Sequence, residues 1–468
     1  MTTVTQFITT LILVLLTQLS LGQEYAGQWT GALDIQGTEL PLILDITQSE
    51  DGYESKLTSP KQGNQAMNVE ETKISGNQLE FSISSLQLTY KGTLSGEKIE
   101  GTFQQGPMSL PLVLEKKAYE EKPANRPQEP KGPFTYHVED VVYSNAKAGG
   151  IALAGTFTKP KDVKNPPVAI MISGSGPQDR NEEIFGHKPF WVIADHFARN
   201  GIAVLRYDDR GTASSKGEFS SATSADFATD VEAAISYLKT RSDINTKQIG
   251  LIGHSEGGFI APMVAKDKKN DVAFIISLAG TGVQGDKLLK KQMRLGAELT
   301  GADNDLIDYE MNLMGQIIDR ATQPGTQEEL SNDMKNIINT MKENMPAALL
   351  SKYTDQTIES IASQFSSPWM VYLFTTDPQP NWEQVKCPVL ALNGGLDYQV
   401  PAGDNLEGIS AGLKKAKNKD VTIKEFDGLN HLFQTANSGS GAEYGMIEET
   451  IAPQVLDTMT QWIHKRFQ

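Results

Sequence analysis

The sequence predicts an α/β domain with a mostly parallel sheet, preceded by a small all-β domain. After residue 150, short apolar runs alternate with helical patterns, which is the order that places helices on both faces of a parallel sheet. The apolar runs, each predicted to be a strand, are 151–158, 168–172, 203–207, 249–253, 274–278, 389–393 and 421–426. Between them, stretches such as 225–240 repeat apolar residues at helical spacing.

Residues 23–117 show a different pattern, in which apolar and polar residues alternate between glycine-containing turns. Leu40, Leu42, Leu44 and Ile46, for example, would share one face of a strand. This pattern predicts a small antiparallel β domain, a barrel or half-barrel. It does not indicate a function, because a small barrel more often fills its interior with its own side chains than with a ligand.

The length of 468 residues and two changes of composition predict the domain boundaries. Residues 118–134 are rich in proline and charge, which is typical of a stiff, solvated linker. The second domain is then 135–468, and a chain that starts near Gly132 is expected to fold and act alone. Within it, about 283–384 separates two strands, and its helical patterns predict a helical lid.

Residues 1–22 are predicted to be a secretory signal peptide. The apolar stretch from Phe7 to Leu21 is too short for a comfortable membrane span, and it ends in the small residues Ser20 and Gly22. The first six residues lack Lys and Arg, which departs from the usual pattern. We therefore expect an exported protein, periplasmic or extracellular, with no stable membrane insertion after signal removal.

The charge balance and the spacing of metal-binding side chains exclude several functions. A net charge of −16, from 58 acidic and 42 basic residues, argues against nucleic acid or an anionic membrane as partner. His, Cys and Asp residues show no ligand spacing, so neither a metal nor an organic cofactor is expected. The single cysteine, Cys387, is interpreted as a buried apolar residue. The sequence carries no signal for an oligomeric state.

A candidate nucleophile lies at a strand-to-helix turn. The segment Gly-His-Ser-Glu-Gly, residues 253–257, follows an apolar run and precedes a stretch of small residues. This order predicts a sharp turn that presents a serine hydroxyl, with glycines on both sides because a side chain would not fit. Ser255 is therefore the candidate nucleophile. We interpret His254 as a packing residue, because adjacent side chains at such a turn point in different directions.

A serine nucleophile needs a base, and the chain has six histidines. His431 lies in a loop after the predicted strand 421–426 and is the predicted base. The other histidines are interpreted as surface or packing residues, an interpretation that is weakest for His187.

The orienting acid is expected after the strand between nucleophile and base. Asp397 lies in the loop that follows 389–393, and Asp404 is the alternative. A plain turn residue is the other interpretation of Asp397. The chain order Ser255, Asp397, His431 is the one expected for the α/β-hydrolase fold.

Acyl transfer also needs two backbone N–H groups for the developing oxyanion. Glu256, directly after the nucleophile, is predicted to supply one. Ser175, in a glycine-rich turn after an apolar strand, is predicted to supply the other, with Gly174 next in line. Trp369 and Tyr372, near the end of the predicted lid, belong either to an acyl pocket or to the core.

Five segments together resemble the EstD-like group of bacterial esterases, which are α/β-hydrolases. They are Ser-Gly-Ser-Gly-Pro-Gln-Asp-Arg (173–180), Tyr-Asp-Asp-Arg-Gly (207–211), Gly-His-Ser-Glu-Gly-Gly (253–258), Gly-Gly-Leu-Asp-Tyr-Gln-Val-Pro (394–401) and Leu-Asn-His-Leu-Phe-Gln (429–434). The resemblance covers about 135 to the end and implies carboxylesterase activity on small acyl esters, with the same triad. The segment 211–215 lacks an expected second glycine, which puts the acyl or alcohol selectivity in question.

The expected chemistry is two-step acyl transfer, in which His431 takes the proton of Ser255 and Asp397 stabilises the imidazolium. A bounded pocket under the lid predicts a preference for short acyl chains. A thioesterase or an aminopeptidase-type hydrolase would use the same triad. An inactive binding protein on this fold is disfavoured, because every predicted part of the site is present.

Overall fold

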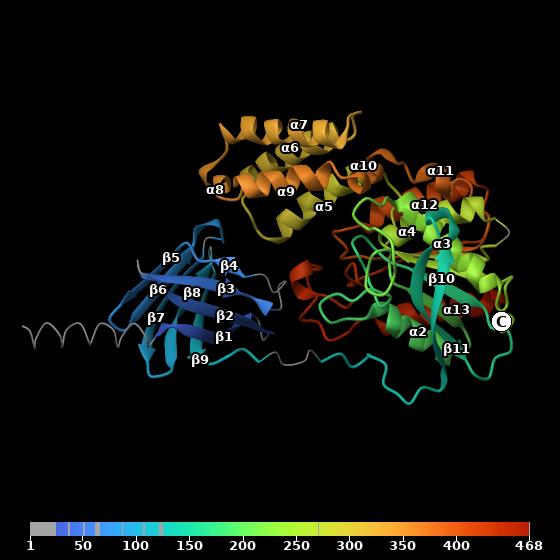
Figure 1. Ribbon diagram of the computed structural model, residues 1–468, viewed down its shortest axis with the longest axis horizontal. Helices are drawn as coiled ribbons and strands as arrows, with labels where there is room; N and C mark the ends of the chain where they lie inside the picture. Colours follow the sequence, from blue (N-terminus) through green and yellow to red (C-terminus); the bar gives the residue numbers. More distant parts are fainter. Residues whose placement is uncertain are drawn as a thin grey trace, which may run out of the picture. The chain divides into compact units, whose positions relative to one another are not determined.

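Two β-sheets form the centres of two compact units in the computed structural model (Figure 1). The structure describes residues 25–35, 38–49, 52–60, 66–86, 88–105, 108–120, 125–269 and 271–467. The predicted signal peptide lies outside these described residues. The units comprise residues 1–123 with 347–352, and residues 124–346 with 353–468.

The first unit is a nine-stranded antiparallel sheet of order β4-β3-β2-β1-β9-β8-β7-β6-β5. Its elements are β1 (Gly27–Ile35), β2 (Thr38–Ser49), β3 (Gly52–Thr58), β4 (Met67–Asn68), β5 (Glu71–Ser75), β6 (Gln78–Ile83), the 3₁₀ turn η2 (Ser84–Leu86), β7 (Leu88–Ser95), β8 (Lys98–Gln105) and β9 (Met108–Lys116). The sheet curls into a half-barrel, and the hydroxyls of Ser55 and Thr72 lie 2.6 Å apart between β3 and β5. The predicted small all-β domain is confirmed.

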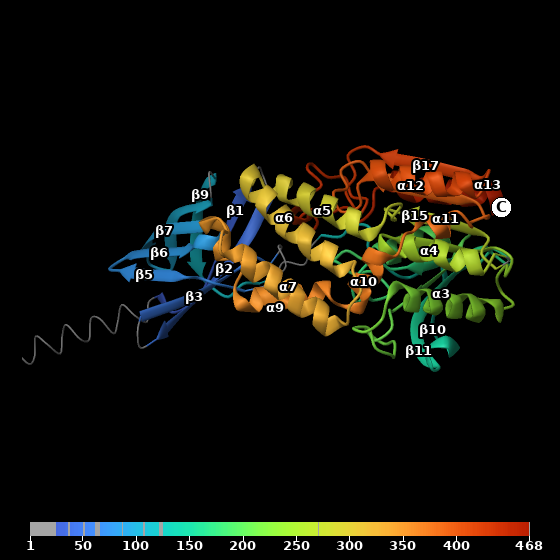
Figure 2. The ribbon, with the colours of Figure 1, turned by 90° about the horizontal axis from the view of Figure 1, so that it is seen from above.

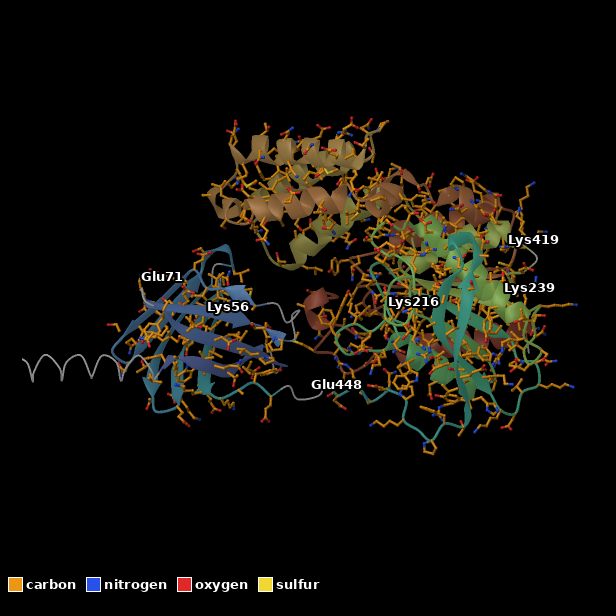
Figure 3. The ribbon with its side chains drawn as sticks, in the orientation of Figure 1. Lys56, Glu71, Lys216, Lys239, Lys419 and Glu448 are labelled. Carbon is orange, nitrogen blue, oxygen red and sulfur yellow. The ribbon has the colours of Figure 1, made fainter. Side chains whose placement is uncertain are left out.

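The alternation seen in the sequence separates the two faces of this sheet. Trp29, Leu44 and Tyr90 are fully buried, whereas the charged side chains of Lys56 and Glu71 lie on the surface (Figure 3). The hydroxyl of Tyr90 donates to two backbone carbonyls, each at 3.1 Å, so the aromatic core leaves this polar group satisfied.

The second unit is built on an eight-stranded sheet of order β10-β11-β13-β12-β14-β15-β16-β17. The strands are β10 (Tyr136–Asn145), β11 (Ile151–Pro160), β12 (Val168–Ile172), β13 (Ala203–Tyr207), β14 (Ile249–His254), β15 (Phe274–Leu278), β16 (Val389–Gly394) and β17 (Val421–Phe426), with the turn η3 (Ala146–Ala148) between β10 and β11. β10, β11 and β13 pair antiparallel, and β13 to β17 are parallel neighbours. The predicted parallel sheet is confirmed.

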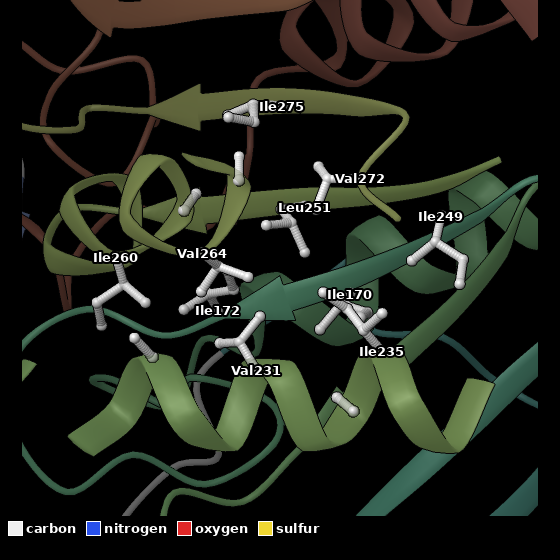
Figure 4. Packing of buried hydrophobic residues seen from close by; sticks show 14 of the residues in the cluster. Ile170, Ile172, Val231, Ile235, Ile249, Leu251, Ile260, Val264, Val272 and Ile275 are labelled. Carbon is white, nitrogen blue, oxygen red and sulfur yellow. The ribbon is translucent and has the colours of Figure 1, made fainter. Parts of the chain in front are cut away.

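Helices cover both faces of this sheet, as its continuous apolar strands require. They are α2 (Pro189–Arg199), α3 (Ser224–Lys239), α4 (Glu256–Asp267), α12 (Ala402–Lys415) and α13 (Pro453–Phe467). α3, α4 and α12 follow one another across one face (Figure 2), and α2 and α13 cover the other. In the core under α3, Val231 and Ile235 point toward Ile170 and Ile172 of β12 (Figure 4).

Seven helices separate β15 from β16 in the described part of the chain. They are α5 (Gly285–Leu299), α6 (Asn304–Ala321), α7 (Gln327–Lys342), α8 (Ala347–Leu350), α9 (Asp355–Phe365), α10 (Pro368–Thr375) and α11 (Gln379–Trp382). α5, α6, α7 and α9 pack side by side (Figures 1 and 2). No helix among the described residues has the length and apolar character needed to cross a membrane. A further 3₁₀ turn, η4 (Gly441–Glu443), precedes α13.

Candidate active site

Ser255 occupies a strained turn between β14 and α4. Its backbone has φ 52° and ψ −114°, a conformation that L-residues rarely adopt and that is often found at functional sites. A side chain on Gly253 would place its Cβ 2.1 Å from the carbonyl oxygen of Gly257, and one on Gly257 would meet that of Ile172 at the same distance. Both glycines are therefore required by the close approach of β12, β14 and α4.

His431 and Asp397 form a buried hydrogen-bonded pair at the ends of two adjacent strands. Nδ1 of His431 lies 2.8 Å from Oδ2 of Asp397, and the side chains are 6% and 0% exposed. Oδ1 of Asp397 accepts the amide N–H groups of Gln399 and Val400, each at 2.9 Å. Asn393 donates to Oδ2 at 3.2 Å. These contacts hold the carboxylate and leave Nε2 of His431 as the nitrogen available to a hydroxyl.

The glycine-rich loop after β12 is held by two aspartates that follow β13. Asp209 accepts the hydroxyl of Ser173 at 2.6 Å and the amide of Gln178 at 3.0 Å. Arg180 makes two parallel contacts with Asp208, from Nε to Oδ1 at 2.9 Å and from Nη2 to Oδ2 at 2.7 Å. Such paired contacts fix geometry as well as charge. The segments 173–180 and 207–211, which both carry the resemblance, are therefore held together by these hydrogen bonds.

The predicted oxyanion residues lie with Ser255 and His431 around one cavity of about 300 Å³. Gly174, Ser175 and Glu256 all line it. The amide of Gly174 donates to the carboxylate of Glu182 at 2.6 Å, so this amide is already engaged. The geometry therefore favours Ser175 over Gly174 as the donor from this loop.

The helices between β15 and β16 form further walls of the cavity, together with the loops after β16 and β17. Its apolar lining includes Leu288, Leu289, Trp369, Met370, Leu373, Val400 and Leu432. Polar side chains line it as well, among them Gln178, Gln292, Gln364 and Gln399. The cavity is therefore bounded by α5, α9 and α10 and mixes apolar walls with amide groups.

Trp369 and Tyr372, predicted as alternatives between pocket and core, separate in the structure. Trp369 lines the cavity, and its Nε1–H donates to Oε1 of Glu256 at 2.8 Å. Tyr372 packs instead against the core cluster and is not among the cavity residues. The positions that face the cavity on α10 are 369, 370 and 373, and position 372 falls beside that stripe. Tyr372 is thus corrected from a pocket residue to a packing residue.

The side chain of Glu256 is buried beneath Trp369. Its Oε1 also accepts the hydroxyl of Ser224, at 2.6 Å. Burial raises the pKa of this carboxyl group, and hydrogen bonds from Ser224, Trp369 and Ser175 oppose that rise. The residue after Ser255 therefore connects the turn between β14 and α4 to both α3 and α10.

Asp404, the alternative acid, and His187, the least certain of the other histidines, do not line the cavity. Asp404 is exposed at the start of α12 and pairs with Lys291 at 2.5 Å. His187 is buried and lies 2.9 Å from both the hydroxyl of Thr450 and the carbonyl oxygen of Tyr444. Burial lowers the pKa of His187 to about 4, so its imidazole is neutral at physiological pH. Its contacts are those of a packing histidine, as interpreted from the sequence.

Sequence reasoning missed Glu182 and its contact with His254. Oε1 of Glu182 lies 3.0 Å from Nδ1 of His254, and both side chains are buried. Glu182 also has a left-handed backbone, with φ 53°. The only available signal was its position, two residues after the glycine-rich segment 173–180. The pairing itself depends on a fold that brings together residues 72 positions apart.

The sheet order, the strained serine between β14 and α4, and the helices between β15 and β16 define an α/β-hydrolase fold. The chain belongs to the Hydrolase_4 family, described as serine aminopeptidase, S33, whose model matches residues 190–435. Ser255, Asp397 and His431 all lie inside that matched range.

The predicted resemblance to EstD is confirmed. The chain is 24% identical over 314 residues to Esterase EstD of Thermotoga maritima, covering 67% of this chain and 66% of that esterase. It thus spans slightly less than two thirds of the relative's length. An uncharacterized 31.7 kDa protein of Escherichia coli is 23% identical over 282 residues, which is 58% of this chain and 84% of that protein.

Solved esterase structures are also similar to this chain at low identity. The Pyrococcus furiosus esterase Pf2001 has 14% identity and a TM-score of 0.42, covering 71% of this chain and 94% of that one. Est1E from Butyrivibrio proteoclasticus, solved with ferulic acid bound, has 16% identity and a TM-score of 0.40. That match covers 70% of this chain and 98% of the other.

Proposed function

We propose that this protein is a serine carboxylesterase that hydrolyses small, short-chain acyl esters through Ser255, His431 and Asp397. The observation that carries the proposal is the buried His431–Asp397 pair, which lies with a strained serine around one bounded cavity. Similarity to EstD supports ester hydrolysis over the other acyl-transfer reactions.

In the proposed mechanism, Nε2 of His431 takes the proton of Ser255 as its oxygen attacks the ester carbonyl. The amides of Glu256 and Ser175 stabilise the oxyanion, and His431 then protonates the departing alcohol. Water repeats the sequence on the acyl-enzyme. Asp397 remains ionised and stabilises the imidazolium through its 2.8 Å contact.

Replacement of the nucleophile tests this proposal. Ser255→Ala should lower ester turnover by about three to six orders of magnitude, because the covalent step is lost. A fluorophosphonate should label Ser255 in the wild type, as located by peptide mass spectrometry. Ser214→Ala is the control, since that serine is exposed. Labelling of a different serine would refute the assignment.

The leaving group is tested separately, since the same triad serves esters, thioesters and amides. Nitrophenyl esters, acyl-CoA thioesters and aminoacyl nitroanilides are compared by kcat/KM on the full chain. The aminoacyl substrates are included because the family is described as serine aminopeptidase. Higher kcat/KM on esters supports the proposal, and a preference for aminoacyl amides would replace it with aminopeptidase activity.

A further inference from the structure

Three segments that meet at the cavity are joined by a chain of hydrogen bonds that the proposed mechanism does not use. Oε1 of Glu182 accepts the amide of Gly174 at 2.6 Å and lies 3.0 Å from Nδ1 of His254. Nε2 of His254 lies 3.1 Å from the carbonyl oxygen of His431. The chain of contacts therefore runs from the glycine-rich loop, through the end of β14, to the base.

Both partners of the His254 ring are hydrogen-bond acceptors. A carboxylate and a backbone carbonyl offer only lone pairs, so both ring nitrogens must donate, and the ring is then an imidazolium. The side chains of His254 and Glu182 are 10% and 7% exposed, so water screens their attraction only weakly.

We propose that Glu182 and His254 are a positioning pair, which holds the Ser175 loop and His431 in the arrangement needed for acyl transfer while His254 carries its proton. This inference rests on the proposed esterase function. The imidazole rings of His254 and His431 lie 4.8 Å apart between centroids, so a shift of one displaces the other. His254 acts through His431 and is not a second base.

The titratable groups around the pair come from separate loops. Asp397 faces His254, and Asp209, which burial keeps largely protonated at neutral pH, interacts with Glu182. Burial lowers the pKa of His254, but the charge and hydrogen bond of Glu182, the His431 carbonyl and the charge of Asp397 outweigh burial. The pKa is therefore raised above its ordinary value, and the cation is lost only as the pH rises through that raised pKa.

Replacement of Glu182 by glutamine removes the charge and keeps an acceptor for Gly174. In Glu182→Gln, kcat should fall by about 10- to 100-fold with little change in KM, because the catalytic groups are displaced and substrate contacts remain. The wild type should lose kcat at alkaline pH as His254 deprotonates, and the variant should lack this loss. Glu183→Gln is the matched control, since its side chain is exposed in the same loop.

Two replacements of His254 separate its two contacts. Asparagine keeps a neutral donor near the position of Nδ1, and glutamine keeps one near the position of Nε2. Neither side chain titrates, so both variants should lack the alkaline loss of kcat. We expect His254→Asn to retain the link to Glu182 and His254→Gln the link to His431. If His254 has a purely structural role, both variants should be less stable than the wild type and should keep its loss of kcat at alkaline pH.

The protonation state is also measured without activity. In the full chain, ¹⁵N shifts of the imidazole groups should show both nitrogens of His254 protonated at neutral pH, with the signal assigned by its loss in His254→Asn or, if that variant does not fold, in His254→Gln. A single protonated nitrogen on His254 at neutral pH would overturn the inference.

Failure of the inference and failure of the proposed function give different results. If wild-type hydrolysis does not depend on Ser255, the proposed function fails. If hydrolysis depends on Ser255 and Glu182→Gln keeps the wild-type kcat and pH profile, only the positioning pair is refuted.

Discussion

Asp209 shows how one buried carboxyl group holds the glycine-rich loop beside Ser255. It is 8% exposed and receives one hydroxyl and one amide hydrogen bond from that loop. Burial raises its pKa to about 8, and the nearby charges of Glu256 and Glu182 add to the rise despite those hydrogen bonds. At neutral pH this carboxyl group is therefore largely protonated in the folded protein.

The raised pKa makes stability depend on pH. Between about 4 and about 8 the folded state binds a proton on Asp209 that the unfolded chain has lost, so this residue's contribution to stability falls as the pH rises. Asp209→Asn should remove that dependence, because the amide can accept from Gln178 and donate to the hydroxyl of Ser173. Thermal melting of the second unit across this pH range measures it.

The control for this prediction is Asp427→Asn, which changes an exposed carboxyl group in the turn after β17. The melting-temperature difference between Asp209→Asn and the wild type should move in favour of the variant as the pH rises. The same difference at every pH would contradict a buried, protonated carboxyl group.

At the scale of single elements, α10 connects the wall of the cavity to the turn at Ser255. Trp369 lines the cavity and donates to Glu256, whose own amide is a proposed oxyanion donor. Tyr372, on the same helix, packs on the core. One helix therefore has a face that lines the cavity and a face that anchors it to the core.

This arrangement predicts an acyl-chain switch. Trp369→Ala should enlarge the bounded cavity and raise the ratio of kcat/KM for octanoyl over butyryl esters by about tenfold or more, since one methylene group is worth 10-fold or more in a fitted pocket. Tyr372→Ala is the control on the same helix and should lower stability with an unchanged ratio. The same change of ratio in both variants would show that α10 acts through its stability and not through its cavity face.

Local sequence patterns were sufficient to predict the turn at Ser255. They were not sufficient to predict contacts between residues far apart in the sequence. Gly253 and Gly257 are required by contacts within one strand–turn–helix unit, so their spacing carries the information. The pairing of Glu182 with His254 and the choice between Trp369 and Tyr372 depend on how distant loops and helices pack. The strand positions were likewise readable from apolar runs, which are buried on both faces of the sheet.

At the scale of the whole molecule, the predicted linker needs revision. Arg126 is 8% exposed and donates to the carbonyl oxygens of Ile447 (2.8 Å), Phe185 (2.8 Å) and Gly445 (3.0 Å). Gln128 exchanges hydrogen bonds with the backbone of Ile451, which is adjacent to the Thr450 that contacts His187. Arg126 and Gln128 therefore hold the second half of the linker on the second unit, while Asn125, Pro127 and residues 131–133 are exposed.

Two truncated chains test where the second unit begins. A chain that starts at residue 124 keeps Arg126 and Gln128 and should hydrolyse nitrophenyl acetate within about tenfold of the full chain, because the proposed catalytic groups all lie in this unit. A chain that starts at Gly132 should melt at lower temperature, since each lost hydrogen bond from a charged group is worth about 1.5–3 kcal/mol. Its kcat should also fall, because Arg126 holds the backbone at Gly445 and Ile447, next to Tyr444, which lines the cavity. Equal melting temperatures and rates for the two chains would show that the second half of the linker is dispensable. An inactive but folded chain from residue 124 would show that the first unit completes the site.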